Sequence, residues 1–318
     1  MGDIATKDTK HTKKTILGGP VVRSRLAVIS LCFVAFVSFV ASRAEAQARK
    51  IYISVDMEGI SGVVGDDQTS AGQSEYGRSR KLMAEDANAA IRGAFEGGAT
   101  EVVVNDSHGS QRNLLPEDLD PRARLISHSF KRHGMVEGLD ATFDAVIFIG
   151  YHAKADSPRG LFAHTGSGVV KDVQVNGRSA GEGGLNTLMA QWYGVPVVMI
   201  SGDDVAVEQQ KEWTPAVRGV VVKRAINMRA VESRPLAEAR REIQTAAKEA
   251  VAAAEKAAPD RQSAYKVRMQ FRNMTIPEVA TAFGEITLVA PDTVEFSRAT
   301  MPDAYRIVRV LYRFINPD

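Results

Sequence analysis

The chain has 318 residues, of which 44% are hydrophobic and 25% charged, a composition typical of a globular protein with one large domain or two modest ones. The formal charge is only +2, and there is no basic stripe interleaved with aromatic residues, which argues against a nucleic-acid partner. The single cysteine, Cys32, lies in an apolar N-terminal run. The rest of the chain therefore has no disulfide or thiolate chemistry, and any metal must be bound by His, Asp and Glu.

The first 46 residues follow the order of a secretory signal peptide. A basic stretch over residues 1–25 precedes an apolar run over residues 26–42, and the small residues Ala44 and Ala46 then form a cleavage-site pattern. Removal of residues 1–46 takes away seven basic and three acidic side chains, so the formal charge moves from +2 to about −2. We expect an exported protein, periplasmic or secreted, without stable membrane contact after cleavage. An uncleaved anchor is the alternative, because the apolar run nearly spans a bilayer.

Beyond this leader, buried-strand patterns alternate with helical patterns. Strands are predicted over residues 50–56, 101–108, 144–152, 194–204 and 219–226, and helices over residues 74–100, from about residue 182, and shortly after residue 204. Asn176-Gly177 predicts a hairpin turn. This order favours an α/β catalytic domain over residues 47–225, with a mostly parallel sheet and flanking helices.

The last third of the chain has a different pattern. An alanine-rich helix is predicted from about residue 233 until Pro259 stops it, and residues 265–271 alternate strictly, as in a half-exposed antiparallel strand. Two short strands within residues 285–299 and a closing helix over residues 301–314 follow. We expect a smaller α+β subdomain over residues 226–318.

Potential metal ligands follow the predicted strands directly. Asp56 and Glu58 are two residues apart after the first strand and therefore point to the same face. His108 and His152 end the next two strands, and Glu182 begins a helix between glycines. Ligands gather at the carboxyl ends of parallel strands, and two histidines with three carboxylates suit one or two zinc-like ions. A cation would also offset the repulsion between the paired acids.

Each of these residues has a structural alternative. A strand-end acid is commonly solvated or paired with arginine, and a strand-end histidine is commonly held by hydrogen bonds within the core. Glu182 could simply be a helix-start carboxylate favoured by the helix dipole.

Five motifs in fixed order carry a family resemblance: "SVDMEGISG", "NDSHG", "GYHAKA", "AHTGSG" and "GEGGLNT". Together they resemble the bacterial zinc-dependent D-aminopeptidases of the DppA type, which are encoded with dipeptide transporters. The resemblance runs from about residue 50 to the C-terminus and is strongest between Asp56 and Asp204. Those family members begin almost at the first strand, whereas this chain has the 46-residue extension.

The resemblance implies a cofactor of two zinc ions per subunit. Asp56 would bridge the ions, Glu58 and His152 would complete one site, and His108 and Glu182 would complete the other. It also implies a homo-oligomer, a decamer of two stacked five-membered rings.

His164, in the loop after "GYHA", corresponds to the family's proposed nucleophile. On physical grounds we favour an acid/base role, because a metal-activated water is already a sufficient nucleophile and histidine titrates near neutral pH. Asn105 and Asp106 precede His108 and are candidates for orienting the ligands, with a turn role as the alternative.

The predicted function is therefore that of an aminopeptidase acting on short peptides with an N-terminal D-amino acid, such as D-Ala-D-Ala. One alternative is another dinuclear metallohydrolase, an amidase or phosphoesterase. The other is a periplasmic peptide- or metal-binding protein without turnover, for which a histidine beyond the five ligands, His164, would have no purpose.

Overall fold

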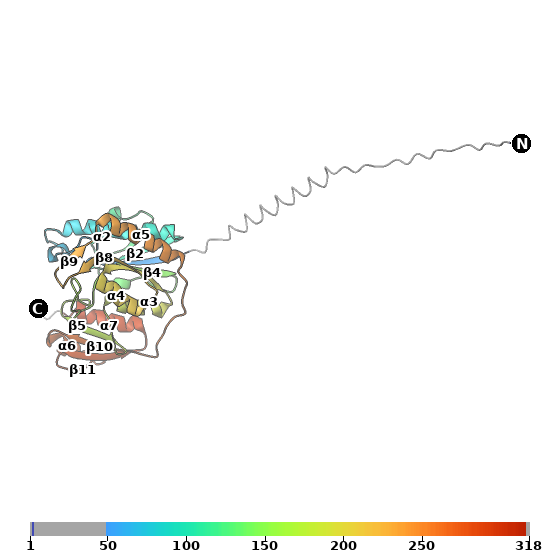
Figure 1. Cartoon of the computed structure of the whole chain (residues 1–318). Coiled ribbons are helices and arrows are strands. Elements are labelled where there is room, and N and C mark those ends of the chain that lie inside the picture. Colours follow the sequence, from blue (N-terminus) through green and yellow to red (C-terminus); the bar gives the residue numbers. More distant parts are fainter. Residues whose placement is uncertain (1, 3–48, 316–318) are drawn as a thin grey trace. The chain divides into compact units, whose positions relative to one another are not determined.

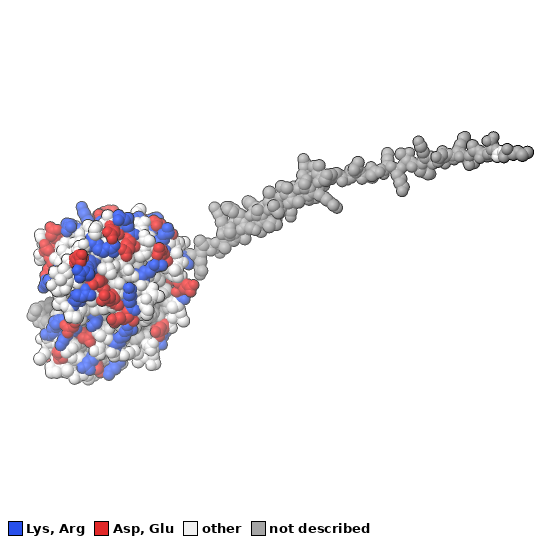
Figure 2. Space-filling model, viewed as in Figure 1, with Lys and Arg blue, Asp and Glu red and all other residues white. Residues whose placement is uncertain are grey.

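The structure is a computed structural model that describes Gly2 and residues 49–315. The predicted leader over residues 1–46, including Cys32, lies outside the described residues apart from Gly2. Within the described part, no helix is both long enough and apolar enough to cross a membrane. On the face shown in Figure 2, basic and acidic side chains are interspersed.

A seven-stranded sheet in the order β3-β2-β1-β4-β7-β8-β9 forms the centre of the fold. Its strands are β1 (Lys50–Val55), β2 (Glu101–Asp106), β3 (Ala123–Ile126), β4 (Ala145–Tyr151), β7 (Val197–Asp203), β8 (Arg218–Ala225) and β9 (Val231–Ser233). All neighbouring strands are parallel except the edge pair of β8 and β9. Every residue of β4 is buried, as expected for a strand covered on both faces. The predicted mostly parallel α/β sheet is thus confirmed.

Helices cover both faces of this sheet (Figure 1). On one side lie α2 (Tyr76–Glu96) and α5 (Leu236–Ala252), and on the other lie α3 (Glu182–Tyr193) and α4 (Asp204–Trp213). The buried residues of α5 recur at helical spacing, with Ala239, Ile243 and Ala247 all at 0% exposure against the sheet and α2.

Helices α2 and α5 approach so closely that α2 needs a glycine at the contact. A Cβ atom on Gly93 would lie 2.2 Å from the backbone oxygen of Gln244 in α5. Gly77, in the first turn of the same helix, has open space around it.

We therefore expect Gly93→Ala to lower the free energy of unfolding by about 1–3 kcal/mol, because the added methyl group must push the two helices apart. Gly77→Ala, the matched control, should be neutral or slightly stabilising, because alanine is the better helix former. Thermal denaturation of both variants checks this. Equal melting temperatures of the two variants would show that α2 and α5 can move apart without a loss of stability.

A smaller sheet of five antiparallel strands has the order β11-β12-β10-β5-β6. Its strands are β5 (Val170–Val175), β6 (Arg178–Ser179), β10 (Tyr265–Phe271), β11 (Thr287–Ala290) and β12 (Thr293–Arg298), and α6 (Thr275–Ala280) lies beside it. Residues of β10 alternate between buried and more exposed, as their sequence predicts.

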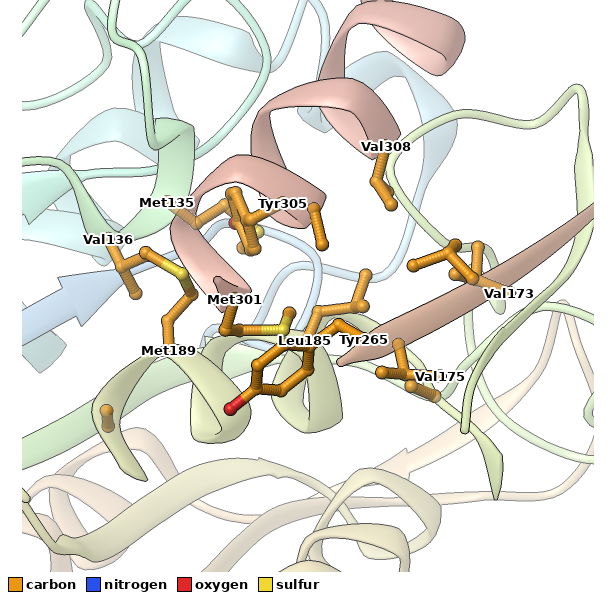
Figure 3. Packing of buried hydrophobic residues seen from close by; sticks show 14 of the residues in the cluster. Met135, Val136, Val173, Val175, Leu185, Met189, Tyr265, Met301, Tyr305 and Val308 are labelled. Atoms are coloured by element: carbon orange, nitrogen blue, oxygen red, sulfur yellow. The ribbon is translucent and has the colours of Figure 1, made fainter. Parts of the chain in front are cut away.

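Helix α7 (Met301–Arg313) joins the smaller sheet to the rest of the fold. Its Met301, Tyr305 and Val308 belong to one apolar cluster with residues of α3 and of the smaller sheet (Figure 3). The C-terminal helix is thereby packed beside α3, whose first residue is Glu182.

Two features differ from the expectations. The sheets do not divide at residue 225, because β5 and β6 belong to the smaller sheet, while β9 and α5 belong with the larger one. Helix α5 ends at Ala252 instead of continuing to Pro259. The Arg49 side chain binds the last carbonyls of α5, including that of Ala252 at 3.2 Å, and the backbone N–H of Asp260 then donates to Gln191 in α3 at 2.8 Å. The segment after α5 is thus held by other partners.

Candidate metal and catalytic site

Three neighbouring strands bring the predicted ligands together. Strand β1 lies between β2 and β4, so Asp56, directly after β1, lies between His108 and His152. One carboxylate oxygen of Asp56 is 3.3 Å from Nδ1 of His108, and the other is 3.4 Å from Nε2 of His152. A single carboxylate therefore faces an imidazole on each side.

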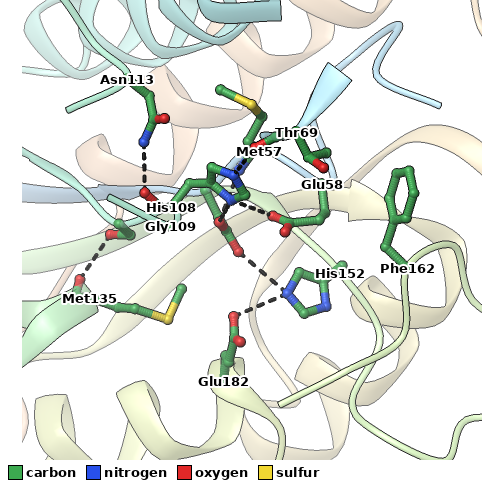
Figure 4. Close-up of polar contacts among 12 residues, drawn as sticks. Met57, Glu58, Thr69, His108, Gly109, Asn113, Met135, His152, Phe162 and Glu182 are labelled. Carbon is green, nitrogen blue, oxygen red and sulfur yellow. Dashed lines mark hydrogen bonds and ion pairs between the residues drawn. The ribbon is translucent and has the colours of Figure 1, made fainter. Parts of the chain in front are cut away.

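A second carboxylate accompanies each histidine (Figure 4). Glu58 lies 2.9 Å from Nδ1 of His108, and Glu182 lies 3.1 Å from Nε2 of His152. Glu58 is thus the hydrogen-bond partner of His108 and Glu182 that of His152, while Glu58 also lies close to His152 in a group with His164. The strand order explains the two hydrogen bonds, since Glu58 turns toward the β2 side of Asp56 while α3 brings Glu182 to the β4 side. The assignment of Glu58 and His152 to one ion, and of His108 and Glu182 to the other, stays a prediction.

Backbone carbonyl groups fix the tautomers of these two histidines. Nε2 of His108 donates to the carbonyl oxygen of Thr69 at 2.6 Å, and Nδ1 of His152 donates to that of Ala153 at 2.9 Å. A carbonyl oxygen can only accept, so in each neutral ring the other nitrogen, the one facing the carboxylates, carries the lone pair that a metal needs. Side-chain patterns in the sequence give no signal for such carbonyl partners.

His164 lies beside this cluster and is its most open member. Its ring stacks on His152 with 4.1 Å between centroids, and its side chain is 25% exposed. Nδ1 of His164 donates to the carbonyl oxygen of Phe162 at 2.8 Å, and Nε2 lies 3.5 Å from Glu182. The lone pair of the neutral ring therefore faces the site and is free to exchange a proton.

Burial and the neighbouring charges shift the pKa values of the carboxylates and histidines in this cluster. Burial alone would raise the pKa of Glu58 and Glu182, but His108 holds the pKa of Glu58 well below its usual range, and His152 lowers that of Glu182 to about 2. Burial would likewise lower the pKa of both histidines, but the same carboxylates raise it well above the usual value. Burial, followed by the charge of Glu58, raises the pKa of Asp56. A divalent cation at this cluster must displace the histidine protons, so its affinity falls as the pH falls.

The donor atoms fit metal ions. Asp56, Glu58 and His108 offer ligand atoms within 4.8 Å of one another, and so do Asp56, His152 and Glu182. These two groups share Asp56 and use all five predicted ligands, and imidazole with carboxylate suits zinc. A third group of the same compactness combines Glu58, His152 and His164.

Asn105 and Asp106 make no hydrogen bond with any of the five ligand side chains. The Asp106 carboxylate accepts from the backbone N–H groups of Asn113 at 2.5 Å and Leu114 at 2.8 Å, and the Asn113 side chain donates to the carbonyl oxygen of His108 at 2.7 Å. The side-chain oxygen of Asn105 accepts from Lys131 at 2.8 Å. Asp106 thus holds the backbone that carries His108, and Asn105 is one step further from the site.

A buried lysine that the sequence analysis did not single out holds the segment after β1. Lys223 of β8 is 0% exposed, and its ammonium group donates to the carbonyl oxygens of Glu58 at 2.6 Å, Ile60 at 3.0 Å and Val63 at 2.5 Å. Burial lowers the pKa of Lys223 to about 8. The sequence signal for this buried lysine is its position inside the apolar run "GVVVKRAI", which predicts a buried strand.

Lys223→Met is expected to weaken zinc binding about 10- to 100-fold, because the Glu58 segment loses its common donor. It should also lower the free energy of unfolding by roughly 2–4 kcal/mol, since buried carbonyl groups are left unpaired. Zinc titration and chemical denaturation measure the two effects. Arg224→Met is the matched control, because the next residue of β8 makes only an exposed ion pair with Glu232. Wild-type zinc affinity in Lys223→Met would contradict the positioning role.

Comparison with known proteins identifies the family. Residues 49–310 match the family Peptidase_M55, described as D-aminopeptidase, so the chain belongs to this family. A D-aminopeptidase of Bacillus subtilis (strain 168) is 46% identical over 183 residues, which are 58% of this chain and 66% of that relative, just under two thirds of its length.

The fold has a solved counterpart in the same family. The structure described as Zn-dependent D-aminopeptidase DppA from Bacillus subtilis, a self-compartmentalizing protease, shares 36% sequence identity with this chain at a TM-score of 0.80. The match covers 85% of this chain and 99% of the other. The predicted family, and with it the class of enzyme, are confirmed.

Proposed function

We propose that this protein is an aminopeptidase with two zinc ions per subunit that hydrolyses short peptides with an N-terminal D-amino acid, such as D-Ala-D-Ala. The observation that carries the proposal is the placement of Asp56 between two histidine–carboxylate pairs, within a chain of the D-aminopeptidase family. Zinc, when bound, polarises the scissile carbonyl group and lowers the pKa of a water molecule.

In this proposal different residues bind the metal ions, orient a ligand and transfer the proton. Asp56, Glu58, His108, His152 and Glu182 hold the ions. The backbone N–H of Gly166 donates to the second oxygen of Glu182 at 2.6 Å and so orients that carboxylate. The free Nε2 of His164 faces the same space and accepts or donates the proton as the amide bond breaks. Direct attack by His164 on the carbonyl group is the alternative.

The test is hydrolysis of D-Ala-D-Ala and L-Ala-L-Ala by the purified protein, with zinc measured in the same sample. We expect about two zinc ions per chain and faster cleavage of the D-dipeptide. Two zinc ions without cleavage of either dipeptide would retain the metal site and refute the substrate. Phosphate esters and simple amides in the same assay separate the other dinuclear hydrolases from a peptidase, and zinc binding without any turnover would indicate a binding protein.

We further propose that the protein acts outside the cytoplasm, on peptides released from the cell wall, where D-alanine is common. The signal-peptide pattern of residues 1–46 supports this placement. Fractionation of cells expressing the full chain tests it. Recovery of the protein in the cytoplasm at full length would refute export.

We also propose that the protein forms a homo-oligomer, specifically a decamer. The solved relative is described as self-compartmentalizing. Residues 49–315 also expose large apolar side chains near the smaller sheet, with Met274 at 66%, Phe283 at 49% and Val289 at 42% exposure. Sedimentation analysis should give a mass several times the 34.4 kDa of one precursor chain, and a monomer at micromolar concentration would refute it.

A further inference from the structure

Helix α7 contributes to the same pocket as the metal cluster. The pocket has a volume of about 100 Å³, and Asp56, His108 and His164 line it together with Arg309 and other residues. Metal binding gives a role to the acidic and histidine side chains of this pocket, but it gives none to Arg309.

Among residues 49–315, the buried Arg309 has no anionic partner. Its exposure is only 4%, and its Nε has no hydrogen-bond partner. No ion pair among residues 49–315 includes Arg309. The guanidinium carbon lies 5.8 Å from the centroid of the Phe314 ring, a cation–π contact that supplies no negative charge. Burial of an unpaired guanidinium group is costly, so its retention beside a substrate pocket indicates an anionic ligand.

The surroundings hold the guanidinium group in place and add positive charge. A Cβ atom on Gly134 would lie 2.2 Å from Nη1 of Arg309, so the group lies directly against the backbone at this glycine. Lys131, also 4% exposed, is close enough that, after burial, the charge of Arg309 contributes to lowering the pKa of Lys131 to about 8. Lys131 does not line the pocket, and its ammonium group already donates to Asn105, Asp106 and Ile126, so Arg309 is the buried cation that faces the pocket.

The neighbouring arginine of α7 has a different task. Arg313 is exposed, and its Nη2 donates to the carbonyl oxygen of Gly109 at 3.0 Å, next to His108. The ring of Tyr312 lies over Gly166, where a Cβ atom would be 2.7 Å from it. Arg313 and Tyr312 thus join α7 to the loops of the site, and Arg309 is left without a carboxylate partner among residues 49–315.

We infer that Arg309 binds the free α-carboxylate of the residue that follows the scissile bond, which makes dipeptides the preferred substrate class. The inference rests on the proposed aminopeptidase function. In a dipeptide the scissile carbonyl group and the terminal carboxylate are one residue apart, and the candidate ligands and Arg309 line the same pocket. The planar fork of a guanidinium group matches a carboxylate with two parallel hydrogen bonds.

The experiment compares D-Ala-D-Ala with its C-terminal amide, using the zinc-loaded full chain. We expect the free acid to have a kcat/KM roughly 10- to 100-fold higher, as one charge-assisted contact provides. In Arg309→Met the free acid should fall to the level of the amide, mainly through KM, while the amide is unaffected. Equal kcat/KM for the acid and the amide in the wild-type protein would overturn the inference without any variant. An equal loss of kcat/KM for both substrates in Arg309→Met would also overturn it.

Two controls and one binding measurement make the result specific. Arg306→Met removes an exposed arginine of the same helix, whose ion pair within residues 49–315 is with Asp303 at 3.7 Å, and should keep the acid–amide ratio. Asp318→Asn is the second control, because it tests a carboxylate outside the described residues as a partner of Arg309. It should also keep the acid–amide ratio. If neither peptide is cleaved, the proposed function fails, and calorimetry with D-alanine and D-alaninamide still tests Arg309. Tighter binding of D-alanine that is lost in Arg309→Met supports the contact, and equal binding refutes it.

Discussion

Asp56→Ala is expected to reduce kcat/KM for D-Ala-D-Ala by at least about 10³-fold, or roughly 4 kcal/mol of transition-state stabilisation. The physical reason is that Asp56 is the residue common to both ligand groups, with one oxygen toward His108 and the other toward His152. Without it each ion would retain one histidine and one glutamate, so the zinc content should fall well below two per chain.

The measurement combines zinc content, steady-state kinetics and circular dichroism on the same preparation. The variant should remain folded, because the change removes one of three mutually repelling buried carboxylates. Asp67→Ala, an exposed carboxylate on the segment after β1, is the matched control and should behave as the wild type. An Asp56→Ala protein with two zinc ions and an undiminished rate would remove the basis of the proposed site.

His164→Ala is expected to lower kcat by about 10²- to 10⁴-fold while two zinc ions remain bound. The side chain lies beside the cluster with Nε2 facing it, but the two ligand groups that share Asp56 do not need it. His128→Ala is the control, because His128 is exposed and belongs to none of the three potential metal groups among the described residues.

The alternatives for His164 have different signatures. Loss of zinc together with rate would make His164 a ligand, as its group with Glu58 and His152 permits. A pre-steady-state burst of released product in the wild type would indicate a covalent acyl intermediate and so a nucleophile. Loss of rate with zinc retained and no burst supports proton transfer.

Local patterns were sufficient to predict which residues form the cluster. Asp56 and Glu58 share a face because side chains alternate along a strand, and both histidines end apolar runs that are buried strands. The same reasoning failed where a segment has little pattern of its own. Strand β3 is only partly buried along its four residues, so it shows neither an apolar run nor a clear alternation.

The partners within the site depend on contacts between distant segments. Glu58 is hydrogen-bonded to His108 because β1 lies between β2 and β4 and its end turns toward β2. Lys223 reaches Glu58 from a strand 165 residues away in the sequence. Neither contact has a local signal, because both depend on how strands are ordered across the sheet.

The sequence by itself therefore determined the family, the parallel sheet, the five potential ligands and His164, since these depend on residue type and short-range periodicity. Only the tertiary structure decided the hydrogen-bond partners within the ligand cluster, the carbonyl groups that set each histidine tautomer, and the burial of Arg309 beside the pocket. These features arise when the chain buries its apolar surface and brings remote backbone and side chains within hydrogen-bond distance, and spacing along the sequence does not encode them.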